Sequence, residues 1–196
     1  MAGSSKVTDV ADQTPAVIPI VQRATARLRL RPPCEGDFAF MRKLATDPTI
    51  IQFLGRDLEP ETRTQQRLDN IRRGNADGSA AVWLLQLAQT HEFIGTFGFW
   101  QRTPAHNRAE VGYELLPAFW GKGLMVEAGR SVLQFGFEDW QLHRAEANVD
   151  PDNVRSLNLL QRLGFAREAQ LREHYRHGDR YIDTVILGLL RSQWKQ

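Results

Sequence analysis

The chain has 196 residues, with 25 Lys and Arg against 23 Asp and Glu, which leaves a formal net charge of +2. This length fits one domain, and the near balance of charge argues against a nucleic-acid partner. No apolar run approaches the roughly 18 residues of a membrane-spanning helix, so we expect no membrane partner either. The first residues lack the basic and apolar regions of a secretory signal. A single cysteine, Cys34, permits no intrachain disulfide, and this fits a cytoplasmic protein.

The N-terminal part divides into a tail and the start of a domain. Residues 1–24 show no sustained hydrophobic period and are predicted to form a flexible tail, whereas residues 25–196 form one domain. The alternating run ARLRLR, from Ala26, predicts a strand that ends at two prolines. Asp37 then caps a predicted helix that Asp47 and Pro48 end. A second helix is predicted from Pro60 to about Gly74.

The rest of the chain alternates strands and helices after an initial meander. Two apolar runs separated by three residues predict a hairpin. The later segments carry alternating or helical spacing. The pattern predicts a mixed α/β (α+β) sheet with helices on both faces. The predicted strands cover 81–88, 92–100, 108–116, 143–149, 165–173 and 181–190, and the predicted helices cover about 120–139 and 153–163.

The most informative segment is PAFWGKGLMVE, residues 117–127. A predicted strand enters it and a predicted helix leaves it, with Gly121 and Gly123 on either side of Lys122. Glycine lets the backbone approach a ligand closely, and the free N–H groups at a helix start favour an anion such as a diphosphate. A simple tight turn is the alternative. Val126 stands where a dinucleotide-binding fingerprint needs Gly or Ala, and the spacing of a P-loop is absent.

Two longer stretches resemble the GNAT superfamily of acetyl-CoA-dependent N-acetyltransferases: AEVGYELLPAFWGKGLMVEA, and LHRAEANVDPDNVRSLNLLQRLGFAREAQLRE. The motifs stand in the family's order and spacing. The resemblance covers about residues 26–194, and the branch it points to is RimJ/RimL-like, whose better-known members acetylate N-terminal amines of ribosomal proteins. It implies a central twisted, mostly antiparallel sheet of about seven strands, with helices on both faces.

The resemblance implies that a neutral primary amine attacks the thioester of acetyl-CoA. This chemistry needs a base for the amine, an N–H donor for the oxyanion and a proton for the leaving thiolate. Glu110, which matches the family's AEIGY-type glutamate, is the candidate base. Glu114 lies on the same face of a regular strand and is the reserve. The alternative for Glu110 is a solvated surface side chain paired with Arg108 or Arg144. The family places a bulge in this strand, and a bulge would alter the alternation.

The resemblance also implies how the coenzyme is held. The backbone of Leu115 and Leu116 would meet the pantetheine arm, and an N–H of Leu115 or a neighbour would hold the thioester oxygen. Amides of the glycine turn would hold the diphosphate. These amides belong to Trp120, Gly121, Lys122, Gly123, Leu124 and Met125.

The later helix begins with Asn153, followed three residues on by Ser156. Helix capping is one interpretation of Asn153. The family's interpretation gives Asn153 a hydrogen bond to the coenzyme arm and places Ser156 near the thiol. Leu160 stands where many members carry the tyrosine that protonates the thiolate, so Ser156 becomes the candidate acid. The sequence also departs at Ala118, where the family's turn often has Gln or Arg.

The acceptor is the least defined part of the site. The family builds its acceptor pocket from the first two helices and the loop after the meander, which here supply Phe53, Leu54, Arg56, Arg102 and His106. A protein or peptide N-terminal amine, a small-molecule amine, and a non-catalytic acyl-CoA-binding domain all stay open. The five histidines lack the spacing of metal ligands, so no metal is expected. A homodimer is left open.

Overall fold

A twisted eight-stranded sheet forms the centre of the molecule in the computed structural model, which describes residues 17–54 and 60–195. The strand order is β1-β2-β3-β4-β5-β6-β8-β7. Among the described strands, β5 and β6 pair in parallel and all other neighbours pair antiparallel. The predicted mixed α/β, mostly antiparallel fold is therefore confirmed. The strands are β1 (Arg23–Ala24), β2 (Leu28–Arg31), β3 (Ala81–Leu87), β4 (Phe93–Thr103), β5 (Arg108–Leu115), β6 (Arg144–Val149), β7 (Ala166–His177) and β8 (Arg180–Leu190).

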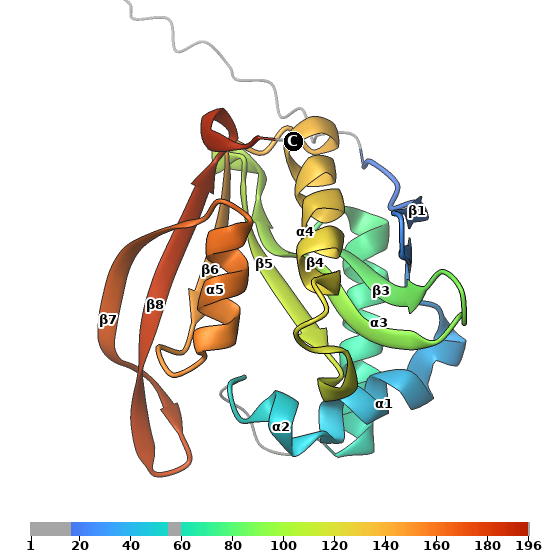
Figure 1. Cartoon of the computed structure of the whole chain (residues 1–196), viewed down its shortest axis with the longest axis horizontal. Helices are drawn as coiled ribbons and strands as arrows, with labels where there is room; N and C mark the ends of the chain where they lie inside the picture. The colour runs from blue at the N-terminus through green and yellow to red at the C-terminus, as the bar shows by residue number, and fades with distance from the viewer. Residues whose placement is uncertain (1–16, 55–59, 196) are drawn as a thin grey trace, which may run out of the picture.

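Helices cover both faces of this sheet, with α4 and α5 in front and α1 and α3 behind in Figure 1. In front, Val132 of α4 and Leu160 of α5 belong to the larger buried cluster together with Phe97 of the sheet. Behind, Met41 of α1 and Leu68 of α3 form a second cluster with residues of β3. The helices are α1 (Phe38–Thr46), α2 (Pro48–Ile51), α3 (Glu61–Asp77), α4 (Leu124–Gln134), which continues as a π-helix (Phe135–Asp139), and α5 (Val154–Arg162).

The parallel strands β5 and β6 pair over only a short stretch and then diverge. Their register runs from Arg108 opposite Arg144 to Glu110 opposite Glu146. Further along, β5 pairs only with β4 in the described sheet, and β6 pairs with β8. The facing backbone edges beyond Glu110 thus have no ladder between them, and a ligand has room to bind there.

Several predicted boundaries shift for local reasons. The second helix runs past Gly74 to Asp77, and Gly78, with a φ of 77°, caps it. A Cβ on Gly74 would lie 2.8 Å from the Cβ of Ala80, so glycine inside the helix lets the start of β3 approach. The bulge expected in residues 108–116 is not there. The irregularity lies in β4, between Trp100 and Thr103, and the pairing of β5 is regular from residue 110 to residue 115.

The predicted tail, residues 1–24, is described only from residue 17. Ile18 and Ile20 pack against the larger core cluster, and the carbonyl of Val21 accepts a hydrogen bond from the indole N–H of Trp83 at 2.9 Å. Residues 23–24 form β1, which raises the strand count from about seven to eight. The boundary of the tail stays a prediction, but its last eight residues contact the domain.

Candidate active site

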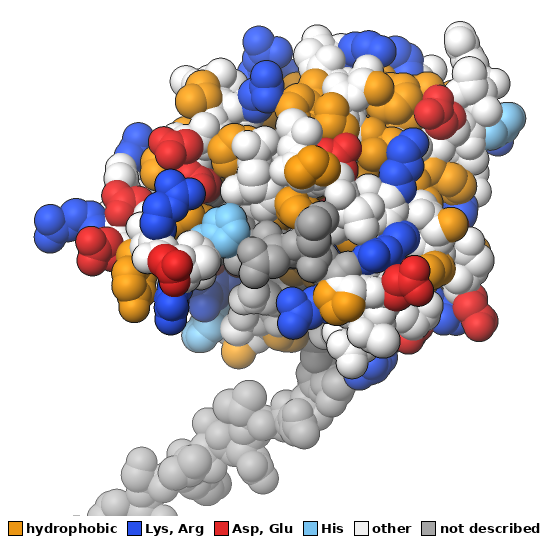
Figure 2. Space-filling model, turned by 90° about the horizontal axis from the view of Figure 1, so that it is seen from below, with side chains coloured by type: hydrophobic (Ala, Val, Ile, Leu, Met, Phe, Trp, Pro, Cys, Tyr) orange, Lys and Arg blue, Asp and Glu red, His pale blue; other side chains and the backbone are white. Residues whose placement is uncertain are grey.

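A cavity of about 330 Å³ opens where the carboxyl end of β5, the glycine turn, α2 and the start of α5 meet. Its lining includes Ile50 from α2, Tyr113 and Glu114 from β5, Gly121 from the turn and Ser156 from α5. Figure 2 views the molecule from the end on which α2 lies, and shows hydrophobic side chains interspersed there with charged side chains of both signs.

The glycine turn has the geometry that an anion-binding turn requires. Gly121 and Gly123 have φ values of 74° and 73°, in the left-handed region that favours glycine. Gly123 is the N-cap of α4, so the first N–H groups of the helix point out of its end. A Cβ on Gly121 would meet no atom within 4 Å, which leaves open space beside the backbone. The Arg155 guanidinium lies 4.7 Å from the centroid of the Trp120 ring and adds positive charge to this wall.

The structure separates the two leucines predicted to meet the pantetheine arm. The N–H of Leu116 donates to the carbonyl of Ile94 at 2.8 Å, and its carbonyl accepts from Phe119. Because N–H directions alternate along an antiparallel pair, the N–H of Leu115 turns to the opposite edge, toward the gap beside β6. Leu115 lines the cavity, whereas Leu116 is buried and is not part of its described lining. The backbone of Leu116 is therefore already committed to the fold.

The remaining predicted coenzyme residues mostly converge on the cavity. Trp120, Gly121, Gly123, Leu124 and Met125 all line it. Lys122 is not among the described lining residues. Its carbonyl accepts a hydrogen bond from Arg27, and its ammonium group lies 5.2 Å from the centroid of the Phe119 ring.

The start of α5 brings its predicted residues to the same cavity. The Asn153 side chain accepts a hydrogen bond from the N–H of Ser156 at 3.1 Å, which confirms the capping interpretation. Both residues also line the cavity. The Ser156 hydroxyl lies 2.5 Å from the hydroxyl of Tyr113. Leu160, at the position of the family's tyrosine, is fully buried in the core and contributes no polar group.

Glu110 and Glu114 lie on the same face of β5, as the alternation predicts, but in different surroundings. Glu114 lines the cavity and forms a two-point ion pair with Arg67 of α3, at 2.7 and 3.0 Å. Glu110 lies about 13 Å farther back along the strand and outside the described lining of the cavity. Burial raises the pKa of the Glu110 carboxyl, a hydrogen bond with Asn148 partly offsets this, and the nearby carboxylate of Glu146 raises it further.

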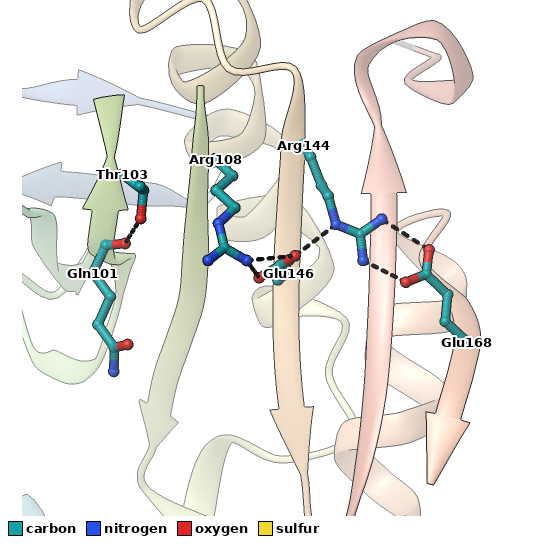
Figure 3. Close-up of polar contacts among 6 residues, drawn as sticks. All are labelled: Gln101, Thr103, Arg108, Arg144, Glu146 and Glu168. Carbon is teal, nitrogen blue, oxygen red and sulfur yellow. Dashed lines mark hydrogen bonds and ion pairs between the residues drawn. The ribbon is translucent and has the colours of Figure 1, made fainter. Parts of the chain in front are cut away.

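Figure 3 shows a row of ion pairs that runs across the sheet through Glu146, the residue that stands opposite Glu110 in the register of β5 and β6. Arg108 pairs with Glu146 at 3.2 Å, Glu146 pairs with Arg144 at 2.7 Å, and Arg144 pairs with Glu168 on β7. The row passes over Gly188 of β8, where a Cβ would lie 2.5 Å from atoms of Arg144 and Glu168. The two arginines predicted as surface partners of Glu110 thus pair with Glu146 instead.

The predicted acceptor residues separate in the same way. Phe53 and Leu54 line the cavity, and Arg56 lies outside the described residues. Arg102 and His106 do not line the described cavity, because they precede β5 while the glycine turn follows it, some 25 Å away along the strand. Burial lowers the pKa of Arg102, whose guanidinium lies 4.4 Å from the centroid of the Trp140 ring.

Two lining residues, Tyr113 and Ile50, and the ion-pair partner of a third, Arg67, escaped prediction. Tyr113 carries a sequence signal, since it lies in the quoted AEVGYEL strand, but its partner is 43 residues away. Arg67 lies on a polar helix, and nothing local distinguishes it from the other arginines there. The short helix α2, which supplies Ile50, follows directly on the Asp47-Pro48 break and has only four residues.

Within residues 17–54 and 60–195, no group of three His, Cys, Asp or Glu side chains is placed to hold a metal ion. In the same ranges, every helix is too short or too polar to cross a membrane.

The fold, with a cavity where β5 and β6 diverge, is that of a known class of enzyme. A family-wide pattern described as "Acetyltransferase (GNAT) domain" matches residues 27–166. The chain belongs to the GNAT family of N-acetyltransferases, and its activity is acetyl transfer.

Named relatives cover most of the chain. It is 37% identical over 181 residues to the uncharacterized N-acetyltransferase YoaA of Bacillus subtilis, covering 90% of this chain and 99% of that one. It is 31% identical over 131 residues to the [ribosomal protein uS5]-alanine N-acetyltransferase of Escherichia coli, covering 66% and 68%. Among solved structures, the spermidine N-acetyltransferase of Vibrio cholerae with CoA and spermine superposes with a TM-score of 0.77 at 23% identity, covering 86% and 98%. That likeness shows the fold.

Proposed function

We propose that this chain transfers the acetyl group of acetyl-CoA to a protein or peptide N-terminal amine. The charge of the side chains that line the cavity is the observation that favours a peptide over a polyamine as the acceptor. Glu114 is the sole acidic side chain among the described lining residues, and it already pairs with Arg67. A polyamine with several ammonium groups needs an excess of carboxylates, which this lining lacks. A peptide with one N-terminal amine needs only one.

Acetyl-CoA fits the donor side of the cavity. The open backbone at Gly121 and the first amides of α4 suit a diphosphate, and Arg155 supplies a cation beside them. The carbonyl of Leu115 already accepts a hydrogen bond from the Trp120 indole at 2.8 Å, and the N–H of Leu115 is our candidate donor to the thioester oxygen. Asn153 and Ser156 complete this side. A cytoplasmic location remains a prediction that accompanies this function, and a homodimer is left open.

The catalytic roles fall on both faces of β5. We assign the base to Glu110, whose raised pKa brings it closer to the working pH of a general base, with water carrying the proton across the distance from the cavity. Glu114 is the alternative base, since it lines the cavity directly. Ser156 is our candidate donor to the departing thiolate.

An assay of CoA release over a matched panel of amines tests the proposal. The panel pairs short peptides that have free N-termini with the same peptides blocked at the N-terminus, and adds spermidine, spermine and an aminoglycoside. We expect turnover of the free peptides, none of the blocked ones, and weak turnover of the polyamines. If a small amine is turned over faster than every peptide, the acceptor is a small-molecule amine and not a protein or peptide N-terminus. Tight CoA binding with no release over the panel would mark a non-catalytic acyl-CoA-binding domain.

A further inference from the structure

Two hydroxyl groups that line the cavity, one from β5 and one from α5, lie within hydrogen-bond distance of each other. The phenol oxygen of Tyr113, on β5, lies 2.5 Å from Oγ of Ser156, on α5. Tyr113 is placed rigidly, because its ring stacks on Phe97 at 4.9 Å between centroids. Both residues line the cavity. A serine hydroxyl can rotate freely, so a fixed neighbour decides where its hydrogen points.

Either hydroxyl could donate in this hydrogen bond, and burial together with the distances favours Tyr113 as the donor. Desolvation raises the pKa of the Tyr113 phenol well above its ordinary value, and the hydrogen bond with Ser156 offsets only part of the rise. Tyr113 therefore stays protonated at neutral pH and carries a hydrogen that needs an acceptor. Oγ of Ser156 lies at 2.5 Å and the Ser156 carbonyl at 3.5 Å, so the hydroxyl oxygen is the nearer acceptor.

We infer that Tyr113 is a positioning residue: its phenol donates to Oγ of Ser156, and so directs the single hydroxyl hydrogen of Ser156 into the cavity, toward the sulfur of the leaving CoA. The inference rests on the proposed function. In the transfer, the bond between nitrogen and the acetyl carbon forms, the bond between carbon and sulfur breaks, and its electron pair goes to sulfur. The sulfur finally takes up the proton that the nitrogen loses.

The Tyr113 phenol does not give up its own proton in this step, because a buried phenolate is unfavourable. It strengthens the hydrogen bond from Ser156 to the thiolate, since donors in a chain polarise one another. The fold therefore supplies from β5 a tyrosine hydroxyl that α5 does not supply, since Leu160 is buried in the core.

The first experiment compares Tyr113→Phe, Ser156→Ala and the double variant with the wild type. Phenylalanine keeps the stack on Phe97 and removes only the hydroxyl, and Tyr181→Phe, at an exposed residue, is the matched control. We expect kcat to fall about 10- to 100-fold in each single variant, with KM for acetyl-CoA within about twofold, because only the charged leaving group uses this hydrogen bond. The double variant should be about as slow as Ser156→Ala alone. A kcat of Tyr113→Phe within twofold of wild type, or losses that multiply, would overturn the inference.

A second measurement does not depend on turnover. The thiol of CoA bound to the protein can be titrated through the ultraviolet absorbance of its thiolate. We expect Tyr113→Phe and Ser156→Ala to raise the pKa of the bound thiol by about one unit, while Tyr181→Phe leaves it unchanged. An unchanged pKa in Tyr113→Phe contradicts the inference even if the wild type acetylates no amine. The opposite result, a shifted pKa without turnover of any amine, would retain the hydroxyl pair and reject the proposed function.

Discussion

The two faces of β5 carry the two halves of the proposed site, and they are built differently. The face toward α4 and α5 presents Tyr113 and Leu115, and its neighbours are backbone amides and hydroxyl groups. The opposite face presents Glu110 and Glu114, which interact with charged and polar side chains from α3 and β6. The donor side thus depends on backbone geometry, and the acceptor side depends on which charges distant elements place there.

The acceptor-side face itself contains a second contrast. Glu114 is in the cavity but is held by Arg67, with 11% of the carboxylate side chain and 17% of the arginine side chain exposed. Glu110 is outside the cavity but has no ion-pair partner among the described residues. A base must release its proton-accepting lone pair to substrate, and a two-point pair with arginine opposes this. Access to the cavity therefore favours Glu114 as the base, whereas the raised pKa and the absence of an ion-pair partner among the described residues favour Glu110.

The largest predicted effect decides between these two carboxylates. Glu110→Gln should lower kcat by roughly 10²- to 10⁴-fold with CoA affinity unchanged, because the amide cannot accept a proton at neutral pH. The loss should shrink as pH rises and the substrate amine deprotonates unaided. Steady-state kinetics across pH measure both.

The matched variant is Glu114→Gln, which removes the carboxylate from the two-point ion pair with Arg67 and should destabilise the fold. If Glu110 is the base, Glu114→Gln should affect KM for the amine more than kcat. Full activity of Glu110→Gln together with a collapse of kcat in Glu114→Gln would move the role to Glu114.

The next effect tests the donor side. Gly121→Val should weaken acetyl-CoA binding about 10- to 100-fold, since a branched residue resists a φ of 74° and its side chain occupies the space beside the backbone. Gly178→Val is the control, because Gly178 also has a positive φ and open space but lies in the turn between β7 and β8. Calorimetry with CoA should show a loss in Gly121→Val only. Equal losses in both variants would mean that backbone strain, rather than the site, explains the effect.

The same division explains what the sequence could and could not predict. The glycine turn, Asn153 and Ser156 are local signals, because a helix start imposes its own residue types and spacing. The strands and helices of the sheet follow in the same way from hydrophobic periodicity. The order of these elements follows from the sequence, and most of the residues expected at the coenzyme line one cavity, although their role there stays a prediction.

The acceptor side was predictable only in outline. Arg67 and Glu114 are 47 residues apart in the sequence, and no residue spacing in either segment predicts that they pair. The family's loop after the meander predicts Arg102 at the acceptor pocket, but this loop precedes β5 and the described cavity lies at the other end of that strand. The Leu116 backbone, expected to meet the pantetheine arm, is hydrogen-bonded within the fold instead. The direction of its N–H depends on which neighbouring strand β5 pairs with, and the sequence does not show this.

A smaller effect concerns stability near Glu110. Burial raises the pKa of this carboxyl in the folded protein above its unfolded value of about 4.3, so the folded state prefers the protonated form. The stabilising contribution of Glu110 is complete below that pH and is lost as pH rises through the folded pKa. Glu110→Gln should therefore gain stability relative to wild type between about pH 4 and pH 7. Urea unfolding at the two pH values measures this. A gain that shrinks with rising pH would show that Glu110 is held ionised, as a surface residue paired with an arginine would be.

The smallest effect tests whether the ion-pair row sets the surroundings of Glu110. Gly188→Ala places a methyl group within 2.5 Å of the ends of Arg144 and Glu168, which are flexible side chains and can move aside. We expect a loss of only about 1 kcal/mol, the scale of exposed ion pairs. Gly98→Ala is the contrast, because there the methyl group meets the backbone of Ala81 and Val82 at 2.5 Å, and overpacking should cost about 3 kcal/mol.

With Arg144 displaced in Gly188→Ala, the carboxylate of Glu146 is less neutralised and should raise the pKa of Glu110 further. The acid limb of the kcat profile should therefore move to higher pH by a few tenths of a unit. An unmoved profile in a folded Gly188→Ala variant would show that burial alone sets the pKa of Glu110, and the ion-pair row would then be only a link between strands.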